Sequence, residues 1–220
     1  MENIFSLDVF LISLPIYLAC LIAGYMLSIK PKRDKKLRSL SFSGELYNDK
    51  KSLKIEKVED YDIYLKLARL FRENGEFDKA VQIHKRILQK EGTPKSIEVA
   101  TVLELGQDYL ASGLFDKAEE NLLLGYKIAE KNSTEEKELL YFLSELYERQ
   151  VNWKMAVIYR RKLFETDKTQ AAGLSLLLCN LAKDELSKKN VGNAKELYQE
   201  AISLDSKCLL AIKETIQILF

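Results

Sequence analysis

Two hexapeptides decide the fold of this sequence: GEFDKA at residues 75–80 and GLFDKA at residues 113–118, which lie 38 residues apart. Two further steps of 38 residues lead to WKMA at 153–156 and VGNA at 191–194, so one period connects four units. In each unit an alanine follows a turn and opens an amphipathic segment. Internal repetition at this period predicts stacked helical hairpins.

The residues that precede each turn repeat as well. Apolar residues recur at i, i+3, i+4 and i+7 with a small residue at the third place, which marks a helix face that a second helix approaches closely. The four sets are Tyr64, Leu67, Ala68 and Phe71; Val102, Leu105, Gly106 and Tyr109; Leu140, Leu143, Ser144 and Tyr147; and Leu178, Leu181 and Ala182, after which Glu185 departs from the pattern. We expect helix pairs near 58–74 and 78–90, 96–112 and 116–130, 135–149 and 153–165, and 172–187 and 191–203.

This pattern resembles the tetratricopeptide repeat, in which an aromatic or Leu, a Leu, a small residue and a Tyr on the first helix precede an Ala on the second. The usual period is about 34 residues. The four additional residues here are close to one helical turn, so longer helices keep the same face toward the core. The resemblance implies an all-α solenoid.

Residues 9–29 (VFLISLPIYLACLIAGYMLSI) carry no charge over 21 positions. At a rise of about 1.5 Å per residue, such a helix crosses a hydrocarbon core of about 30 Å. We therefore predict a transmembrane anchor at 1–29. A cleaved signal peptide is the rival interpretation, but it requires a basic N-terminus, whereas this one holds Glu2 and Asp8.

A basic cluster follows the predicted span. It consists of Lys30, Lys32, Arg33, Lys35, Lys36 and Arg38. Bases beside a span stay on the cytoplasmic side, so we expect the repeats to face the cytoplasm. The cluster is either a topology signal alone or also a membrane-surface site for anionic head groups. The remainder of the chain is slightly acidic, which argues against nucleic acid as a partner.

The composition is short of catalytic groups. The chain has one histidine, His84, and its three cysteines, Cys20, Cys179 and Cys208, form no C-x-x-C pair. Nucleotide-binding, metalloprotease and serine-hydrolase motifs are missing from the sequence. We predict a non-catalytic protein without a metal or cofactor, in which His84 is a packed repeat residue rather than a titrating switch. Cys179 and Cys208 are expected to be small buried thiols rather than metal or redox groups.

The first helices of stacked hairpins line a concave groove, and residues off their packing face point into it. A mixture of basic, acidic, aromatic and aliphatic side chains at these positions suits a peptide or a partner helix. An ordinary solvated face is the alternative for any one of them. The predicted groove residues are Leu65, Arg69, Arg72, Leu103, Gln107, Leu110, Tyr141, Glu145, Glu148, Arg149, Cys179, Lys183 and Leu186.

A transmembrane anchor, then a basic cluster, then repeats with a long period follow one another in this sequence. This order resembles the lipopolysaccharide assembly protein B family of Gram-negative bacteria. Strings that carry the resemblance are LFR at 70–72 and LGQDY at 105–109. It implies an inner-membrane adaptor that regulates lipopolysaccharide biosynthesis by promoting proteolysis of the lipid A pathway deacetylase by an FtsH-type membrane protease. The family also has a C-terminal rubredoxin-like zinc module with two C-x-x-C pairs, which we expect this chain to lack. An envelope assembly or translocon-associated scaffold unrelated to lipopolysaccharide control is the alternative.

These expectations divide the chain into four parts. After the anchor at 1–29, residues 30–57 form a basic juxtamembrane segment with room for a degenerate first repeat at 39–57, and 58–206 hold four hairpins. Residues 207–220 are predicted to be an unpaired helix with an exposed apolar patch. Such a patch is either a docking surface, including one for self-association, or the mark of a truncated longer chain.

Overall fold

The computed structural model describes the backbone of residues 58–219 and the side chains of residues 60–216. The predicted membrane span, the basic cluster and residues 39–57 lie outside the described residues. None of the helices within the described part is both long and apolar enough to cross a membrane.

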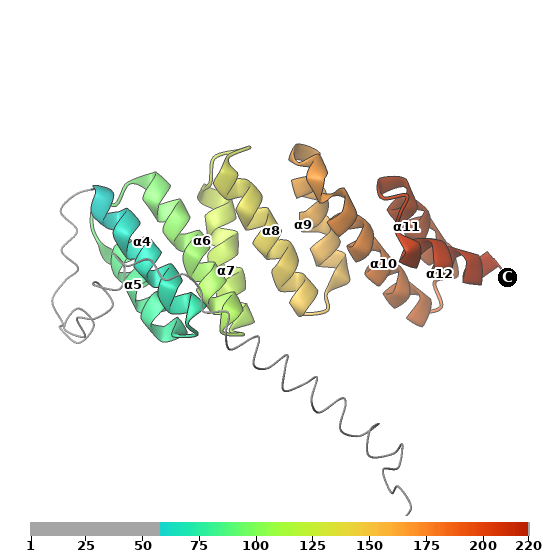
Figure 1. Cartoon of the computed structure of the whole chain (residues 1–220), viewed down its shortest axis with the longest axis horizontal. Coiled ribbons are helices and arrows are strands. Elements are labelled where there is room, and N and C mark those ends of the chain that lie inside the picture. Colours follow the sequence, from blue (N-terminus) through green and yellow to red (C-terminus); the bar gives the residue numbers. More distant parts are fainter. Residues whose placement is uncertain (1–57, 220) are drawn as a thin grey trace, which may run out of the picture. The chain divides into compact units, whose positions relative to one another are not determined.

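Four helical hairpins and a terminal helix follow one another along the described chain, which contains no strand (Figure 1). Each observed boundary lies within two residues of the predicted one. The hairpins are α4 (Val58–Glu73) with α5 (Phe77–Gln89), α6 (Lys95–Ala111) with α7 (Phe115–Ile128), α8 (Thr134–Arg149) with α9 (Trp153–Thr166), and α10 (Ala171–Ser187) with α11 (Val191–Leu204). A short 3-10 turn, η1 (Lys168–Gln170), precedes α10, and α12 (Leu209–Leu219) ends the series.

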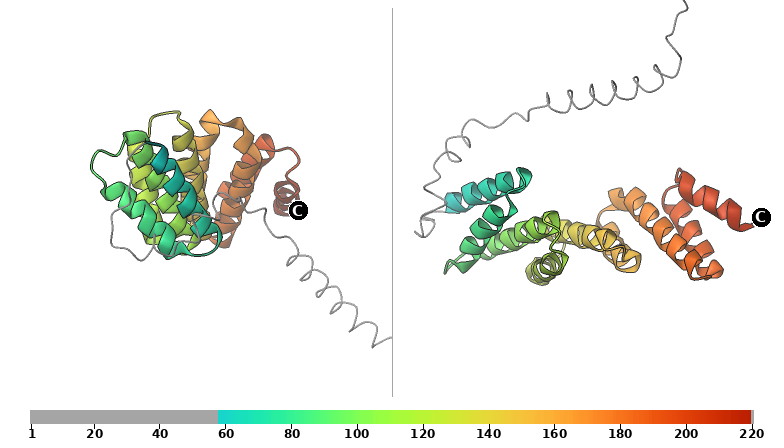
Figure 2. Two further views of the ribbon diagram at one scale, coloured as in Figure 1. Left: turned by 60° about the vertical axis from the view of Figure 1, so that its left-hand side comes forward. Right: turned by 90° about the horizontal axis from the view of Figure 1, so that it is seen from below.

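The hairpins stack in chain order, so each second helix also packs on the first helix of the next hairpin (Figure 2). The first helices α4, α6 and α8 additionally contact one another in sequence. The structure thereby confirms the expectation of an all-helical, tetratricopeptide-like solenoid.

The repeat alanines are equivalent in the structure. Ala80, Ala118, Ala156 and Ala194 are each the fourth residue of a second helix, and each is completely buried. The small residue on the facing helix permits this close packing. At Gly106, for example, an added Cβ would lie only 2.7 Å from the Cγ and Cδ2 atoms of Leu122. The predicted small-residue position is therefore a point of helix contact.

The turn inside each hairpin repeats the same backbone geometry. Gly75, Gly113, Val151 and Lys189, which are 38 residues apart, have φ values of 77°, 78°, 59° and 65°. The amide of the residue that follows each of these donates a hydrogen bond to the carbonyl oxygen five positions before it. The N–O distance is 2.8 Å both from Glu76 to Phe71 and from Asn152 to Tyr147. This is the Schellman closure, for which glycine is the favoured residue because it has no Cβ.

Replacing Val151 with glycine is therefore expected to stabilise the protein by about 1 kcal/mol, since a β-branched residue is strained in the left-handed region. Val151 is 64% exposed, so little packing is lost. Urea unfolding followed by far-UV circular dichroism measures the change. The matched control, Gly113→Val, should destabilise by a similar amount, and a stability unchanged in both variants would contradict the strain argument.

The hydrophobic core has two parts. The smaller cluster lies in α4 and α5 and consists of Tyr61, Leu65, Leu67, Ala68, Ala80, Ile83 and Ile87. The larger cluster runs from Val99 in α6 to Ala211 in α12. The first hairpin thus has a core of its own, and charged residues of α4, α5 and α6 contribute to its contact with the second.

Candidate partner-binding surface

One position of the predicted groove is accessible in all four first helices. Arg69 and Lys183 are exposed, while Gln107 and Glu145 are half-buried. These four residues, spaced by 38, are called the accessible row from here on. Their side chains are all polar, and in chain order their charges are positive, neutral, negative and positive. That they contact a partner remains a prediction.

The aliphatic lining expected for the groove requires correction. Leu65, Leu103 and Leu110 retain 8%, 3% and 3% of their accessible surface, and Cys179 retains none. These side chains belong to the core: Leu65 is part of the small cluster, and the other three are part of the large one. Because α4, α6 and α8 contact one another, they cover positions that are open on a single hairpin, whereas Cys179 on α10 lies against Cys208.

The other predicted groove residues differ in accessibility. Tyr141 is 40% exposed and Arg149 is also exposed, whereas Arg72, Glu148 and Leu186 are half-buried. Arg149 donates to Glu145 (2.5 Å) on its own helix and to the carbonyl oxygen of Leu110 (3.3 Å) on α6. It therefore joins α8 to α6 at the surface.

A buried ion network joins the first hairpin to the second. Arg72 of α4 donates through Nη2 to Glu104 Oε2 (2.6 Å) and through Nη1 to Asp108 Oδ1 (2.8 Å), both on α6. Arg69 also pairs with Glu104. The second oxygen of Asp108 lies 2.6 Å from Nδ1 of His84 on α5. His84 and Asp108 are completely buried.

The expectation that His84 is a packed repeat residue is consistent with this position, but its acidic partner was not foreseen. One oxygen of Asp108 accepts from Arg72, and the other shares a hydrogen bond with Nδ1 of His84. The Nε2 atom is buried and has no hydrogen-bond partner among the described residues. Only one ring nitrogen is therefore satisfied, and Asp108 determines the orientation of the ring.

The charges in and around the network shift the pKa values of three groups. Burial alone raises the pKa of Glu104, but hydrogen bonds and charges of Arg69 and Arg72 outweigh it, so the pKa lies below its ordinary value. The hydrogen bond to Glu104 raises the pKa of Arg69. Glu138 of α8 has a raised pKa because it is partly buried and lies near Glu104 and Glu135. Glu104 is thus ionised throughout the neutral range.

A second buried cation lies beneath Tyr141. Arg160 of α9 is 7% exposed, donates through Nε to Ser144 Oγ (3.1 Å) and through Nη1 to Gln170 Oε1 (3.0 Å). Its guanidinium carbon lies 4.7 Å from the centroid of the Tyr141 ring. Within the described residues Arg160 forms no ion pair with an acid. Tyr141 therefore covers a positive group with an aromatic face, which is a favourable cation–π arrangement.

Sequence reasoning missed Glu104, Asp108 and Arg160. A signal for the first two existed, since two acids four residues apart on α6 complement Arg69 and Arg72, three apart on α4. Arg160 occupies the repeat position of His84 and Leu122, which also gave a hint. Neither signal identifies the partners, because those of Glu104 and Asp108 lie on the preceding hairpin and those of Arg160 are not marked by the repeat pattern.

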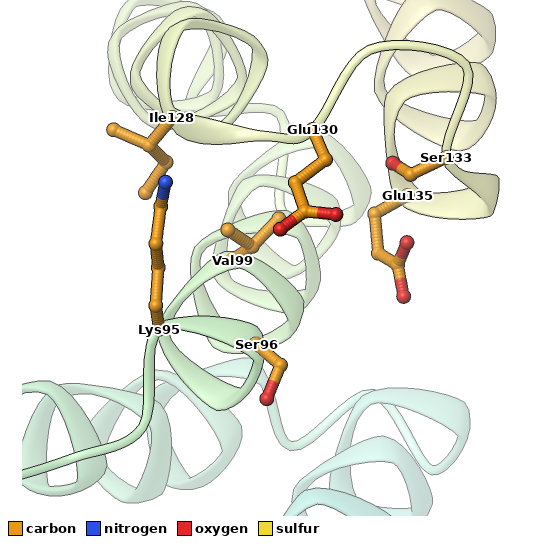
Figure 3. Close-up of a pocket in the computed structure, with 7 residues that line it drawn as sticks. All are labelled: Lys95, Ser96, Val99, Ile128, Glu130, Ser133 and Glu135. Atoms are coloured by element: carbon orange, nitrogen blue, oxygen red, sulfur yellow. The ribbon is translucent and has the colours of Figure 1, made fainter.

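The described residues also form a small open pocket of about 230 Å³ between the start of α6, the end of α7 and the start of α8 (Figure 3). Lys95, Ser96, Val99, Ile128, Glu130, Ser133 and Glu135 line it. Its walls hold no nucleophile paired with a base, and no group of three potential metal ligands occurs among the residues that the structure describes. The pocket therefore shows no catalytic arrangement.

The repeated hairpins and their shared turn geometry define the described chain as a tetratricopeptide-repeat-like solenoid. Residues 63–98 match the family model described as Tetratricopeptide repeat. The curated relatives are more specific. The chain is similar to Lipopolysaccharide assembly protein B of Escherichia coli K12, with 25% identity over 149 residues that cover 66% of this chain and 36% of that protein. The protein of the same name from Haemophilus influenzae is 26% identical over 158 residues, covering 71% and 39%.

The chain thus spans well under half the length of these curated relatives. Solved structures share the fold. A MamA protein superimposes with a TM-score of 0.50 at 22% identity, covering 72% of this chain and 80% of that one. The C-terminal part of a TPR repeat-containing protein from Cytophaga hutchinsonii gives 0.52 at 18% identity, covering 71% and 60%. At these identities the neighbours show the fold alone.

Proposed function

We propose that this chain is a membrane-tethered, non-catalytic adaptor that regulates lipopolysaccharide biosynthesis at the bacterial inner membrane. The observation that carries the proposal is the similarity to Lipopolysaccharide assembly protein B over two thirds of the chain. In this proposal a span at residues 9–29 anchors the chain, and the repeats face the cytoplasm.

The proposed partner surface is the accessible row together with Tyr141 and Arg149. Polar, partly exposed residues at one repeat position present spaced hydrogen-bonding groups to an extended segment or a helix. The partners in this proposal are an FtsH-type membrane protease and its client, the lipid A pathway deacetylase. The chain would bring the two together, which needs binding and no chemistry.

Charge-changing substitutions in the row test the binding surface. Lys183→Glu, which reverses a charge, combined with Gln107→Arg, which adds one, should weaken partner binding about tenfold or more, because like charges brought together at a contact carry a large penalty. The matched control is Glu120→Lys at an exposed site of the second helix α7. Complementation of a deletion strain then reads out deacetylase level and lipopolysaccharide amount, with the row variant failing and the control succeeding.

The outcomes of the deletion experiment distinguish control of lipopolysaccharide biosynthesis from a general scaffold function. If deletion leaves both readouts unchanged, lipopolysaccharide control is ruled out and a general envelope scaffold remains. A reporter fused to the C-terminus tests the topology. The proposal expects activity from a cytoplasmic reporter, and activity from a periplasmic one would contradict it.

A further inference from the structure

The two cysteines of the described chain meet at its C-terminal end. Cys179 lies in the middle of α10, and Cys208 directly precedes α12, yet their Sγ atoms are only 3.7 Å apart. Cys179 is completely buried, whereas Cys208 is half-buried. A thiol that solvent can reach therefore touches one that it cannot.

Cys208 has the surroundings of a reactive thiol. Its carbonyl oxygen accepts the first hydrogen bond of α12, from the Ile212 amide (3.2 Å), so the residue lies at the N-terminal end of that helix. Burial raises the pKa of Cys208, but hydrogen bonds from the Ser175 hydroxyl, the Ala211 amide and the Cys179 thiol outweigh it and lower the pKa. Ser175 also lies 2.9 Å from the carbonyl oxygen of Ala201 and can donate to only one acceptor at a time. Whichever acceptor Ser175 chooses, Cys208 keeps its hydrogen bonds from the Ala211 amide and the Cys179 thiol.

Cys179 has the opposite character. Burial, together with the neighbouring Cys208, raises the pKa of Cys179 to about 12. The proton of the pair therefore stays on Cys179, and the thiolate forms on Cys208. A partly exposed thiolate beside a buried thiol is the arrangement of an attacking and a resolving cysteine.

We propose that Cys208 and Cys179 are an oxidation site for peroxides, which closes a disulfide between α10 and the start of α12. In the first step the Cys208 thiolate attacks one oxygen of hydrogen peroxide, the O–O bond breaks, and the product is a sulfenic acid and hydroxide, which takes up a proton. In the second step Cys179 attacks Cys208 Sγ, the S–O bond breaks, and the hydroxyl leaves as water with the Cys179 proton. Two thiols and one peroxide thus give one disulfide and two waters.

The geometry allows the bond with a small movement. The two sulfur atoms must approach from 3.7 Å to about 2.0 Å. Cys208 lies in the short connection between α11 and α12, so a shift there does not disturb a hairpin. The bond would fix a helix whose described apolar residues include the exposed Leu209 and Ile216. Oxidation would thereby control whether the start of α12 can move away from Cys179, and a dithiol reductant would reverse it.

The test uses the full chain with Cys20→Ser, so that only the two cysteines of interest remain. Hydrogen peroxide should remove both thiols from alkylation and produce a linked peptide pair containing Cys179 and Cys208 under non-reducing conditions. With Cys179→Ser added, the reaction should stop at a sulfenic acid on Cys208 that a cyclic diketone traps. With Cys208→Ser instead, Cys179 should remain alkylatable after denaturation. Far-UV circular dichroism confirms that each variant is folded.

Limited trypsin digestion provides the structural readout, because Lys207 and Lys213 flank the start of α12. The oxidised protein should be cleaved at these sites several-fold more slowly than the reduced one. Two free thiols after peroxide treatment, a disulfide between two chains, or oxidation of Cys208 beyond the sulfenic acid with Cys179 still reduced would each overturn the proposal.

Discussion

Replacing Asp108 with alanine is expected to lower the free energy of unfolding by about 3–5 kcal/mol, which is the typical loss when one member of a buried ion pair is removed. The carboxylate is completely buried and binds two groups, Arg72 and His84. Without it the imidazole loses its one hydrogen bond, and Arg72 retains Glu104 alone. Urea unfolding measures the change.

The matched control is Asp62→Ala, which removes an acid from an exposed pair with Lys66 on α4. That change should alter stability by less than about 1 kcal/mol. Equal effects from both substitutions would contradict the assigned role of Asp108.

The next interface of the solenoid supplies a second control. One period after His84 and Asp108, the chain has Leu122 and Leu146, both completely buried. The double variant His84→Leu, Asp108→Leu copies this apolar pair and leaves no unpaired buried acid. It should therefore be more stable than Asp108→Ala, since apolar replacement of a whole buried pair is often neutral or stabilising.

Loss of the network should also act locally. Because α4 and α5 have their own hydrophobic cluster, weakening their charged contact with α6 is expected to uncouple the first hairpin. In Asp108→Ala, amide hydrogen exchange should accelerate more in α4 and α5 than in α8 and α9. Uniform acceleration would show that the first hairpin is not a separable unit.

Leu143→Ala is expected to lower the free energy of unfolding by about 2–5 kcal/mol, because it combines a lost apolar contact with a cavity. Leu143 is completely buried in α8, within the large cluster that runs from α6 to α12. Chemical unfolding monitored by circular dichroism gives the value. Leu124→Ala on α7 is the matched control, since Leu124 is 47% exposed and should change stability by no more than about 0.5 kcal/mol. A loss below about 1 kcal/mol for Leu143→Ala would contradict its core position.

The helices could be predicted from the sequence because four repeats share one register. The alanine at each second helix and the small residue on each first helix fix which faces meet, so a boundary read in one unit applies to the others. The burial of Leu65, Leu103 and Leu110 could not be predicted from the register of the repeats. It depends on how closely neighbouring first helices approach, and a pattern within one hairpin carries no information on that distance.

Contacts between residues of different repeats could likewise not be predicted from the repeat pattern. The bonds from Arg72 to Asp108 and the approach of Cys179 to Cys208 join residues 36 and 29 positions apart. Neither separation equals the period, so comparing units in register does not bring these residues together. The expectation of small buried thiols rested on the apolar helices in which the two cysteines were placed, whereas in the structure Cys208 lies in the connection between α11 and α12, within 3.7 Å of Cys179.

The central functional claim is that the accessible row contacts a protein partner, and site-specific photo-crosslinking in intact cells tests it most directly. A photoreactive amino acid would replace Gln107 or Lys183 in the row, and Glu120 on α7 as the control. The account predicts crosslinks to the protease, its client or both from the two row positions and none from Glu120. Crosslinks from Glu120 without any from Gln107 or Lys183 would contradict it.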